Sequence, residues 1–129
     1  TPEEIYESPV STFVANFIGA VTLLKGQCTA TGQLRLDSGP RLPLGMDARL
    51  AGRTVYVAIR PEDVQLVSTE TRDALSGRVI SSSYLGNFRR SLVEIAPNVR
   101  LQVEHREPLT PNTVVQLRIT DYNLIEEPA

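Results

Sequence analysis

The sequence predicts a mainly β protein, built as a closed or nearly closed antiparallel barrel and preceded by short helices. Residues 55–59, 99–104 and 115–119 alternate apolar and polar side chains with period two, which is typical of a strand with one buried face. Clusters of Gly, Pro, Asn and Asp separate these and further short strand candidates. Eight or nine short strands at this spacing favour a barrel, because closure protects strand edges rich in Val, Leu and Ile.

The first 19 residues predict two short helices. Thr1 fits an N-cap and Glu4 completes a capping box, and a second helix after Ser11 carries Phe13 and Phe17 on one apolar face. Helices of this length are not stable alone, so their aromatic side chains need another surface to cover them. We therefore expect Tyr6, Phe13 and Phe17 to dock this segment on a neighbouring surface.

The chain accordingly divides into linker helices, residues 1–19, and a β-barrel domain, residues 20–129. Less regular strand candidates lie at residues 21–28, 33–36, 64–67, 75–84 and 89–96. A shift of 58 positions matches five residues in each half: Val57, Ile59, Arg60, Asp63 and Leu66 with Val115, Leu117, Arg118, Asp121 and Leu124. Such a match arises either by chance or by duplication, and a duplication implies two similar small barrels or half-barrels.

The composition excludes several classes of site. The 129 residues, 41% of them hydrophobic, include one Cys and one His, Cys28 and His105, so an intrachain disulfide and a multi-His metal site are impossible. The only Lys, Lys25, lacks the preceding glycine of a phosphate-binding loop. No apolar run is long enough to span a membrane. We expect that this chain, taken alone, is not an enzyme, and that it binds no cofactor or metal.

The charge argues against a nucleic-acid partner. The formal net charge is −2, with 13 basic and 15 acidic residues, and 5% of the residues are aromatic. Proteins that bind single strands in an OB-like barrel use a basic groove and stacking aromatic side chains. Single-stranded nucleic-acid binding therefore remains only a weak alternative, suggested by fold analogy.

The most distinctive string is Arg60-Pro61-Glu62-Asp63. Pro61 cannot donate to a β ladder, so the strand stops there or lies at an edge. Arg60, Glu62 and Asp63 are candidate ligand or interface residues; the alternative, which we favour, is a strand-ending turn tied by an ion pair.

A second candidate surface lies near Tyr84-Leu85-Gly86-Asn87-Phe88. Tyr84 and Phe88 either form a contact surface or pack a barrel corner, and we favour the corner. Ser82, within a run of three serines, and Arg89 are candidate ligand residues. The commoner explanation for the serines is an exposed strand.

Two further residues have structural explanations. His105 is expected to be a solvated loop residue, between Glu104 and Arg106 at a strand end. Cys28 is expected to be a small core residue.

Two stretches of the sequence resemble a known family. Thr1-Pro2-Glu3-Glu4-Ile5-Tyr6-Glu7-Ser8-Pro9 with Phe13-Val14-Ala15-Asn16-Phe17-Ile18-Gly19 resembles the segment between the nucleotide-binding and C-terminal domains in ATPase subunits of ABC importers. Val57-Ala58-Ile59-Arg60-Pro61-Glu62-Asp63-Val64 is similar to a string in the TOBE domain of those subunits, and Tyr84-Leu85-Gly86 to its later corner. The subgroup imports polyamines, iron(III), phosphonates, maltose and glycerol phosphate.

The resemblance implies an OB-like barrel that pairs two ATPase subunits far from their ATP sites. It implies an upstream domain that binds ATP and Mg²⁺, membrane permease subunits as partners, and a place on the cytoplasmic face of the cell membrane. The ATPase motifs are absent from this chain, which begins at Thr1 and not at Met, so we expect a noncatalytic C-terminal regulatory and dimerisation domain. A regulatory protein is a possible further partner. The alternative is a module that senses a small oxyanion or the transported solute, with Arg60, the serine run, Arg89 and Arg90 as candidates.

Overall fold

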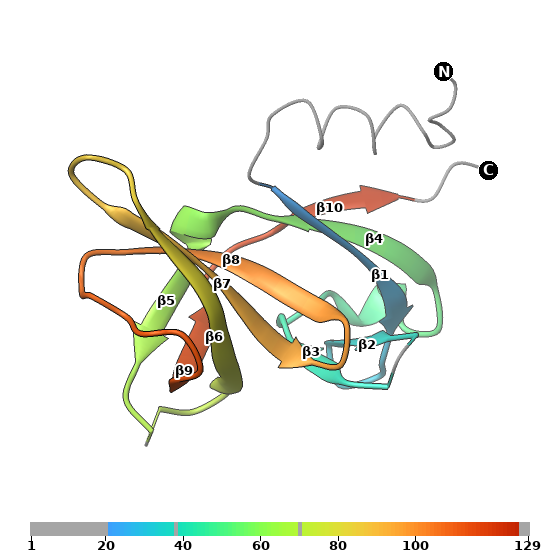
Figure 1. The fold of residues 1–129 in the computed structure, drawn as a ribbon. Coiled ribbons are helices and arrows are strands. Elements are labelled where there is room, and N and C mark those ends of the chain that lie inside the picture. The colour runs from blue at the N-terminus through green and yellow to red at the C-terminus, as the bar shows by residue number, and fades with distance from the viewer. Residues whose placement is uncertain (1–20, 38, 70, 127–129) are drawn as a thin grey trace. The chain divides into compact units, whose positions relative to one another are not determined.

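The computed structural model describes residues 21–126 except 38 and 70 (Figure 1). The expected helices of residues 1–19, with Tyr6, Phe13 and Phe17, lie outside the described residues. The described chain forms ten strands in two antiparallel five-stranded sheets and two 3₁₀ turns. This architecture confirms the mainly β, OB-like fold class.

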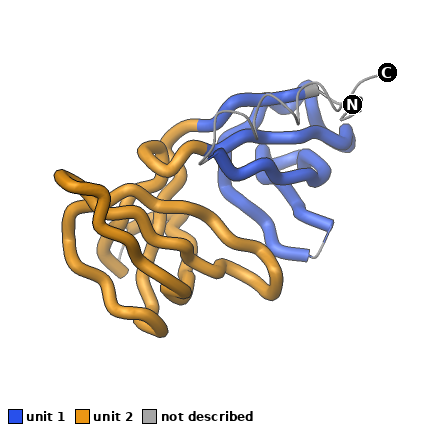
Figure 2. Tube along the Cα trace, turned by 45° about the horizontal axis from the view of Figure 1, so that its top comes forward, with its two compact units in different colours: residues 1–59, 122–129 blue, residues 60–121 orange. Residues whose placement is uncertain are grey.

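The chain separates into two compact units, residues 1–59 with 122–129 and residues 60–121 (Figure 2). Unit 1 contains β1 (Thr22–Cys28), β2 (Gln33–Leu36), β3 (Arg41–Pro43), η1 (Ala48–Leu50), β4 (Thr54–Ile59) and β10 (Asn123–Glu126). Unit 2 contains η2 (Pro61–Asp63), β5 (Val64–Val67), β6 (Leu75–Tyr84), β7 (Arg89–Ala96), β8 (Val99–His105) and β9 (Val114–Ile119). The predicted strands are confirmed, and β3 and β10 are additional.

The two sheets have the same strand order, β10-β4-β1-β2-β3 and β5-β9-β6-β7-β8. Gly26 of β1 lies opposite Val55 of β4, and Gly77 of β6 lies opposite Val115 of β9. The first strand in each order comes from the chain that leaves the other sheet. β5 follows β4 in sequence but joins the sheet of β9, and β10 follows β9 in sequence but joins the sheet of β4. The fold therefore has two similar halves that exchange one strand, which supports a duplication.

In β4 and β9, the strand register pairs the residues of the two halves slightly differently from the 58-position sequence match. Val57 pairs with Leu124, and Leu117 pairs with Leu66. The structural equivalent of Val57 is thus Leu117, two residues beyond Val115. The match of Leu66 with Leu124 agrees with the strand pairing.

Each unit has its own apolar core. Leu34, Leu42 and Val57 are fully buried in unit 1, and Cys28 is 2% exposed, as expected of a core cysteine. In unit 2 the sheet curls until its two edge strands, β5 and β8, contact each other, and η2 contacts β8. Leu101 and Leu117 lie fully buried within this curled sheet.

The β6–β7 hairpin is much longer than the β1–β2 hairpin that corresponds to it. β1 ends at Cys28, the equivalent of Val79, whereas β6 continues to Tyr84. A bulge between Val79 and Ser81 marks the start of this extension. Because an extra residue moves the side chains that follow it to the other face, Val79 and Ser82 both point into unit 2. The extension supplies the residues of the site described next.

Candidate functional site

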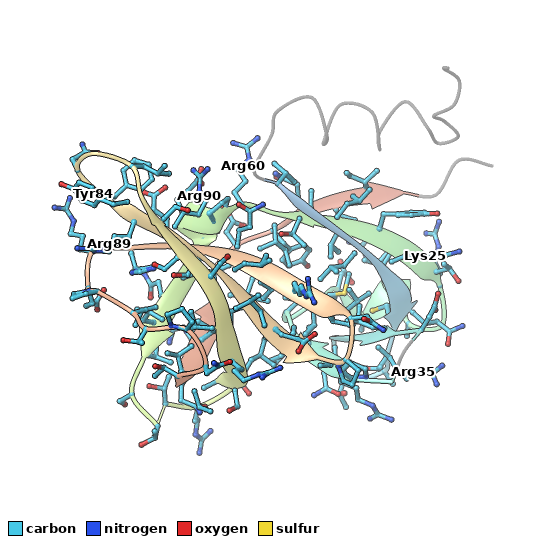
Figure 3. The ribbon with its side chains drawn as sticks, viewed as in Figure 1. Lys25, Arg35, Arg60, Tyr84, Arg89 and Arg90 are labelled. Atoms are coloured by element: carbon cyan, nitrogen blue, oxygen red, sulfur yellow. The ribbon has the colours of Figure 1, made fainter. Side chains whose placement is uncertain are left out.

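The tip of the β6–β7 hairpin combines aromatic and cationic side chains. Leu85 N donates to Phe88 O at 2.8 Å, and Gly86 between them has a φ of +104°, which strongly favours glycine. The Arg89 guanidinium lies 5.0 Å from the centre of the Tyr84 ring, its cross-strand neighbour (Figure 3). Arg90 lies 5.8 Å from the centre of the Phe88 ring. The hairpin tip therefore carries two ring–guanidinium pairs, and Tyr84, which is 64% exposed, faces solvent.

A row of hydrogen bonds crosses the inner face of the same sheet. Ser91, 1% exposed, donates through Oγ to Ser82 Oγ at 2.9 Å and lies 2.7 Å from His105 Nε2. His105 Nδ1 lies 2.7 Å from the carbonyl oxygen of Glu107. The expectation that His105 is a solvated loop residue is wrong: it ends β8 and is 7% exposed. The regular alternation of β8 places it on the same face as Leu101.

The hydrogen positions in this row depend on the charge of the His105 ring. A carbonyl only accepts, so Nδ1 carries a hydrogen in either state. In the neutral ring, Nε2 accepts from Ser91, whose single hydroxyl hydrogen is then no longer available to Ser82. In the charged ring, Nε2 donates to Ser91, which donates onward to Ser82.

The outer face of the hairpin carries a cleft of about 350 Å³. Its lining is formed by Ser81, Ser83, Leu85, Arg90, Ser91, Leu92 and Gln102. Ser83 pairs with Arg90 across β6 and β7, and Leu92 pairs with Gln102 across β7 and β8. Ser82, the serine that the sequence favoured, points to the inner face instead, because of the bulge. A neighbouring cleft of about 440 Å³ is lined by Asn87, Phe88, Glu104, His105 and Arg106.

Arg90 is the only charged side chain in the lining of the first cleft. Its Nε–H is buried and has no hydrogen-bond partner, a costly arrangement for a charged donor. Glu104 lies opposite it on β8, but no ion pair joins the two. By contrast, Glu94, four residues further along β7, contacts both Arg78 and Arg100, at 3.2 and 3.6 Å.

The η2 turn carries the other candidate residues, Arg60, Glu62 and Asp63. The carbonyl oxygen of Asp63 accepts from Thr120 N at 2.8 Å and from Thr120 Oγ1 at 3.0 Å. Burial and the nearby carboxylates of Asp121 and Glu62 raise the pKa of the Asp63 carboxyl, against a smaller opposite effect of Arg60. The expected ion pair is absent: within the described part of the chain Arg60 has no salt bridge, and its Nε–H is buried without a partner.

The structure thus separates the candidate residues into two groups. Ser82, Tyr84, Phe88 and Arg89 share the β6–β7 hairpin, whereas Arg60, Glu62 and Asp63 share η2. Sequence reasoning missed the burial of Ser91 and His105 and the lining residue Gln102. The pairing of neighbouring strands brings these residues together at the hairpin, and no local sequence pattern indicates that pairing.

Neither a metal cluster nor a membrane-spanning helix occurs among the described residues. No three His, Cys, Asp or Glu side chains gather there closely enough to hold a metal ion. The helices of that part of the chain are all too short or too polar to cross a membrane.

Comparison with known proteins gives one family match, to the TOBE domain, over residues 57–125. The sn-glycerol-3-phosphate import ATP-binding protein UgpC of Salmonella typhimurium is 49% identical over 72 residues, covering 53% of this chain and 20% of UgpC. The spermidine/putrescine import ATP-binding protein PotA of Trichormus variabilis is 31% identical over 123 residues, covering 88% of this chain and 31% of PotA. The matched part of this chain therefore spans a fifth to a third of these curated relatives.

Among solved structures, the cytoplasmic molybdate-binding protein ModG with molybdate bound has the same fold. The TM-score is 0.67, and the match covers 83% of this chain and 96% of ModG at 16% sequence identity. At this identity the likeness concerns the fold alone.

Proposed function

Because this chain belongs to the TOBE domain family, we propose that it is the noncatalytic C-terminal regulatory and dimerisation domain of the ATP-binding subunit of an ABC importer. The observation that carries this proposal is the match to import ATP-binding proteins over up to 88% of the chain. The role of this domain is to hold two ATPase subunits together while their nucleotide sites open and close.

The remaining partners follow from the same proposal. The upstream domain binds ATP and Mg²⁺, and this chain needs no cofactor of its own. The subunit lies on the cytoplasmic face of the cell membrane, held there by permease subunits. The solute is a polyamine, iron(III) or a similar one; of these, relatives named for spermidine/putrescine import support a polyamine, and relatives named for sn-glycerol-3-phosphate import add that solute.

The dimer contact is proposed at the hairpin tip. Tyr84 and Leu85 are adjacent, 64% and 45% exposed, and continuous with Phe88 and two guanidinium groups. Aromatic and arginine side chains of this kind dominate the binding energy of protein interfaces. A two-fold axis through the tip would use the same residues from both copies.

Sedimentation equilibrium at micromolar concentration tests the dimer. We expect the wild-type chain to sediment as a dimer and the double variant Tyr84→Ser, Leu85→Ser as a monomer. Val114→Ser is the matched control, since Val114 is also 64% exposed but lies at the start of β9, and it should leave the dimer intact. A wild-type chain that is monomeric at all concentrations would contradict the dimerisation role.

A second candidate function is the sensing of a small ligand by this domain. The observation that favours it is the cleft beside Arg90, in which a guanidinium N–H lacks a partner. A thermal-shift panel of oxyanions, iron(III) and polyamines tests it. We expect at least one oxyanion to raise the melting temperature, and no shift with any compound would remove this candidate.

A further inference from the structure

We propose that the cleft beside Arg90 binds a small organic anion, whose carboxylate or phosphate head contacts Arg90, Ser81 and Ser83 and whose carbon portion packs on Leu85 and Leu92. This inference rests on the second candidate function and names its site and ligand class. The cleft shares Leu85 and Arg90 with the proposed dimer contact, so the experiment measures both properties on the same samples.

The first observation is the hydrogen-bonding capacity of the cleft wall. Ser81 and Ser83 lie two residues apart on the outer face of β6 and are exposed. Within the described part of the chain, the hydrogen bonds of this serine run use the Ser82 hydroxyl and leave those of Ser81 and Ser83 available. Gln102 adds an amide from β8. These groups donate to an anion without first breaking an internal bond.

The second observation is the state of Arg90. It has no salt bridge to another described residue, and its Nε–H has no acceptor. The Nε and one Nη of a guanidinium form a fork that matches two oxygens of a carboxylate or a phosphate. An anion seated on this fork would supply the acceptor that the protein does not.

The third observation is the size and the apolar part of the cleft. Its volume of about 350 Å³ lies at the lower end of small-molecule sites. A bare oxyanion fills a small part of that space, since one water molecule takes about 30 Å³ in the liquid. Leu85 and Leu92 supply apolar surface beside the donors. The site therefore fits an anion with a short carbon chain better than a naked one.

The fourth observation concerns the position of this cleft in the fold. Ser81, Ser83, Leu85 and Arg90 all lie in the extension of the β6–β7 hairpin beyond the bulge, which the β1–β2 hairpin lacks. One half of the duplicated fold therefore carries this extension and the other half does not. Bulges are frequent where a strand aims side chains at a ligand.

Glu104 determines how tightly the anion is held. It faces Arg90 across β7 and β8 without pairing to it, so its charge repels an anion from the same face. Binding is therefore expected near a dissociation constant of about 1 mM, as for one guanidinium and a few hydroxyls. Removal of the Glu104 charge should tighten it.

Titration of the chain, followed by NMR chemical shifts, with inorganic phosphate, ethyl phosphate and butyrate tests the proposal. Ethyl phosphate or butyrate should bind saturably and more tightly than inorganic phosphate, and the preference between the two identifies the head group. Arg90→Gln should weaken binding at least about tenfold and Glu104→Gln should tighten it about threefold. Arg89→Gln, the same charge change on the neighbouring residue, should have little effect.

Three results would overturn the site: no saturable binding of either organic anion, equal losses in Arg89→Gln and Arg90→Gln, or unchanged affinity in Glu104→Gln. Sedimentation of the same samples keeps the two proposals apart. A wild-type chain that is monomeric but binds the anion would contradict only the dimerisation role, and a wild-type chain that is dimeric but binds no anion would contradict only the anion site.

Discussion

The buried hydrogen-bond row of unit 2 makes a sharp prediction for Ser91→Ala. The Ser91 hydroxyl is bonded to Ser82 at 2.9 Å and to His105 Nε2 at 2.7 Å, and Ser91 is 1% exposed. Each bond stabilises by about 1 kcal/mol, and the variant leaves Nε2 of a 7% exposed ring without its partner. The free energy of unfolding should therefore fall by about 2 kcal/mol, or roughly 6–10 °C in melting temperature for a domain of this size.

Urea unfolding followed by circular dichroism measures this change. Ser82→Ala removes one of the two bonds and should cost about 1 kcal/mol. Ser83→Ala, the same chemical change on the exposed face, should alter the free energy of unfolding by less than about 0.5 kcal/mol. Equal effects of Ser91→Ala and Ser83→Ala would refute the reasoning.

Three other predictions follow from single residues. Because the pKa of Asp63 is raised in the folded chain, its protonated form stabilises the fold fully below the ordinary carboxyl pKa, and this stabilisation is lost as the pH rises through the raised pKa. Asp63→Asn should remove that loss, which would appear as a flatter profile of melting temperature against pH. Burial, with a smaller contribution from Asp47, raises the pKa of the Cys28 thiol, so a thiol-reactive disulfide reagent should modify it in urea but not in the folded chain. A Cβ on Gly26 would lie 2.5 Å from the carbonyl oxygen of Arg35, so Gly26→Ala should cost about 1–3 kcal/mol in the same urea titration.

Much of the fold could be predicted because the strands of this chain alternate regularly. The period-two pattern located β4, β8 and β9, and turn residues bounded most of the others. β3 was missed because three residues around Leu42 are too few to show a period. β10 was missed as a strand because its partner, β4, is remote in sequence.

The exchange of β5 and β10 could not be predicted from the sequence. Matching residues in two halves indicate a duplication, but they do not say which sheet each strand joins. Only the register, with Val57 opposite Leu124 and Leu117 opposite Leu66, shows that the strands cross over.

The location of the candidate site could be predicted from the sequence, but the side chains that form it could not. A regular strand through Val79 would send Ser81 inward and Ser82 outward, and the bulge reverses both. The sequence carries no sign of that extra residue, so the face of each serine in the run could not be predicted. His105 was misplaced because charged residues flank it, although it continues the inward series of Leu101 and Val103.

The central claim is that this chain is the noncatalytic end of an ABC importer ATPase subunit, and the coding sequence upstream of Thr1 tests it most directly. Sequencing that region should reveal, in the same reading frame, a phosphate-binding loop followed by the signature motif of ABC ATPases. Permease and solute-binding-protein genes should lie nearby. An upstream reading frame that encodes no nucleotide-binding domain would contradict the claim.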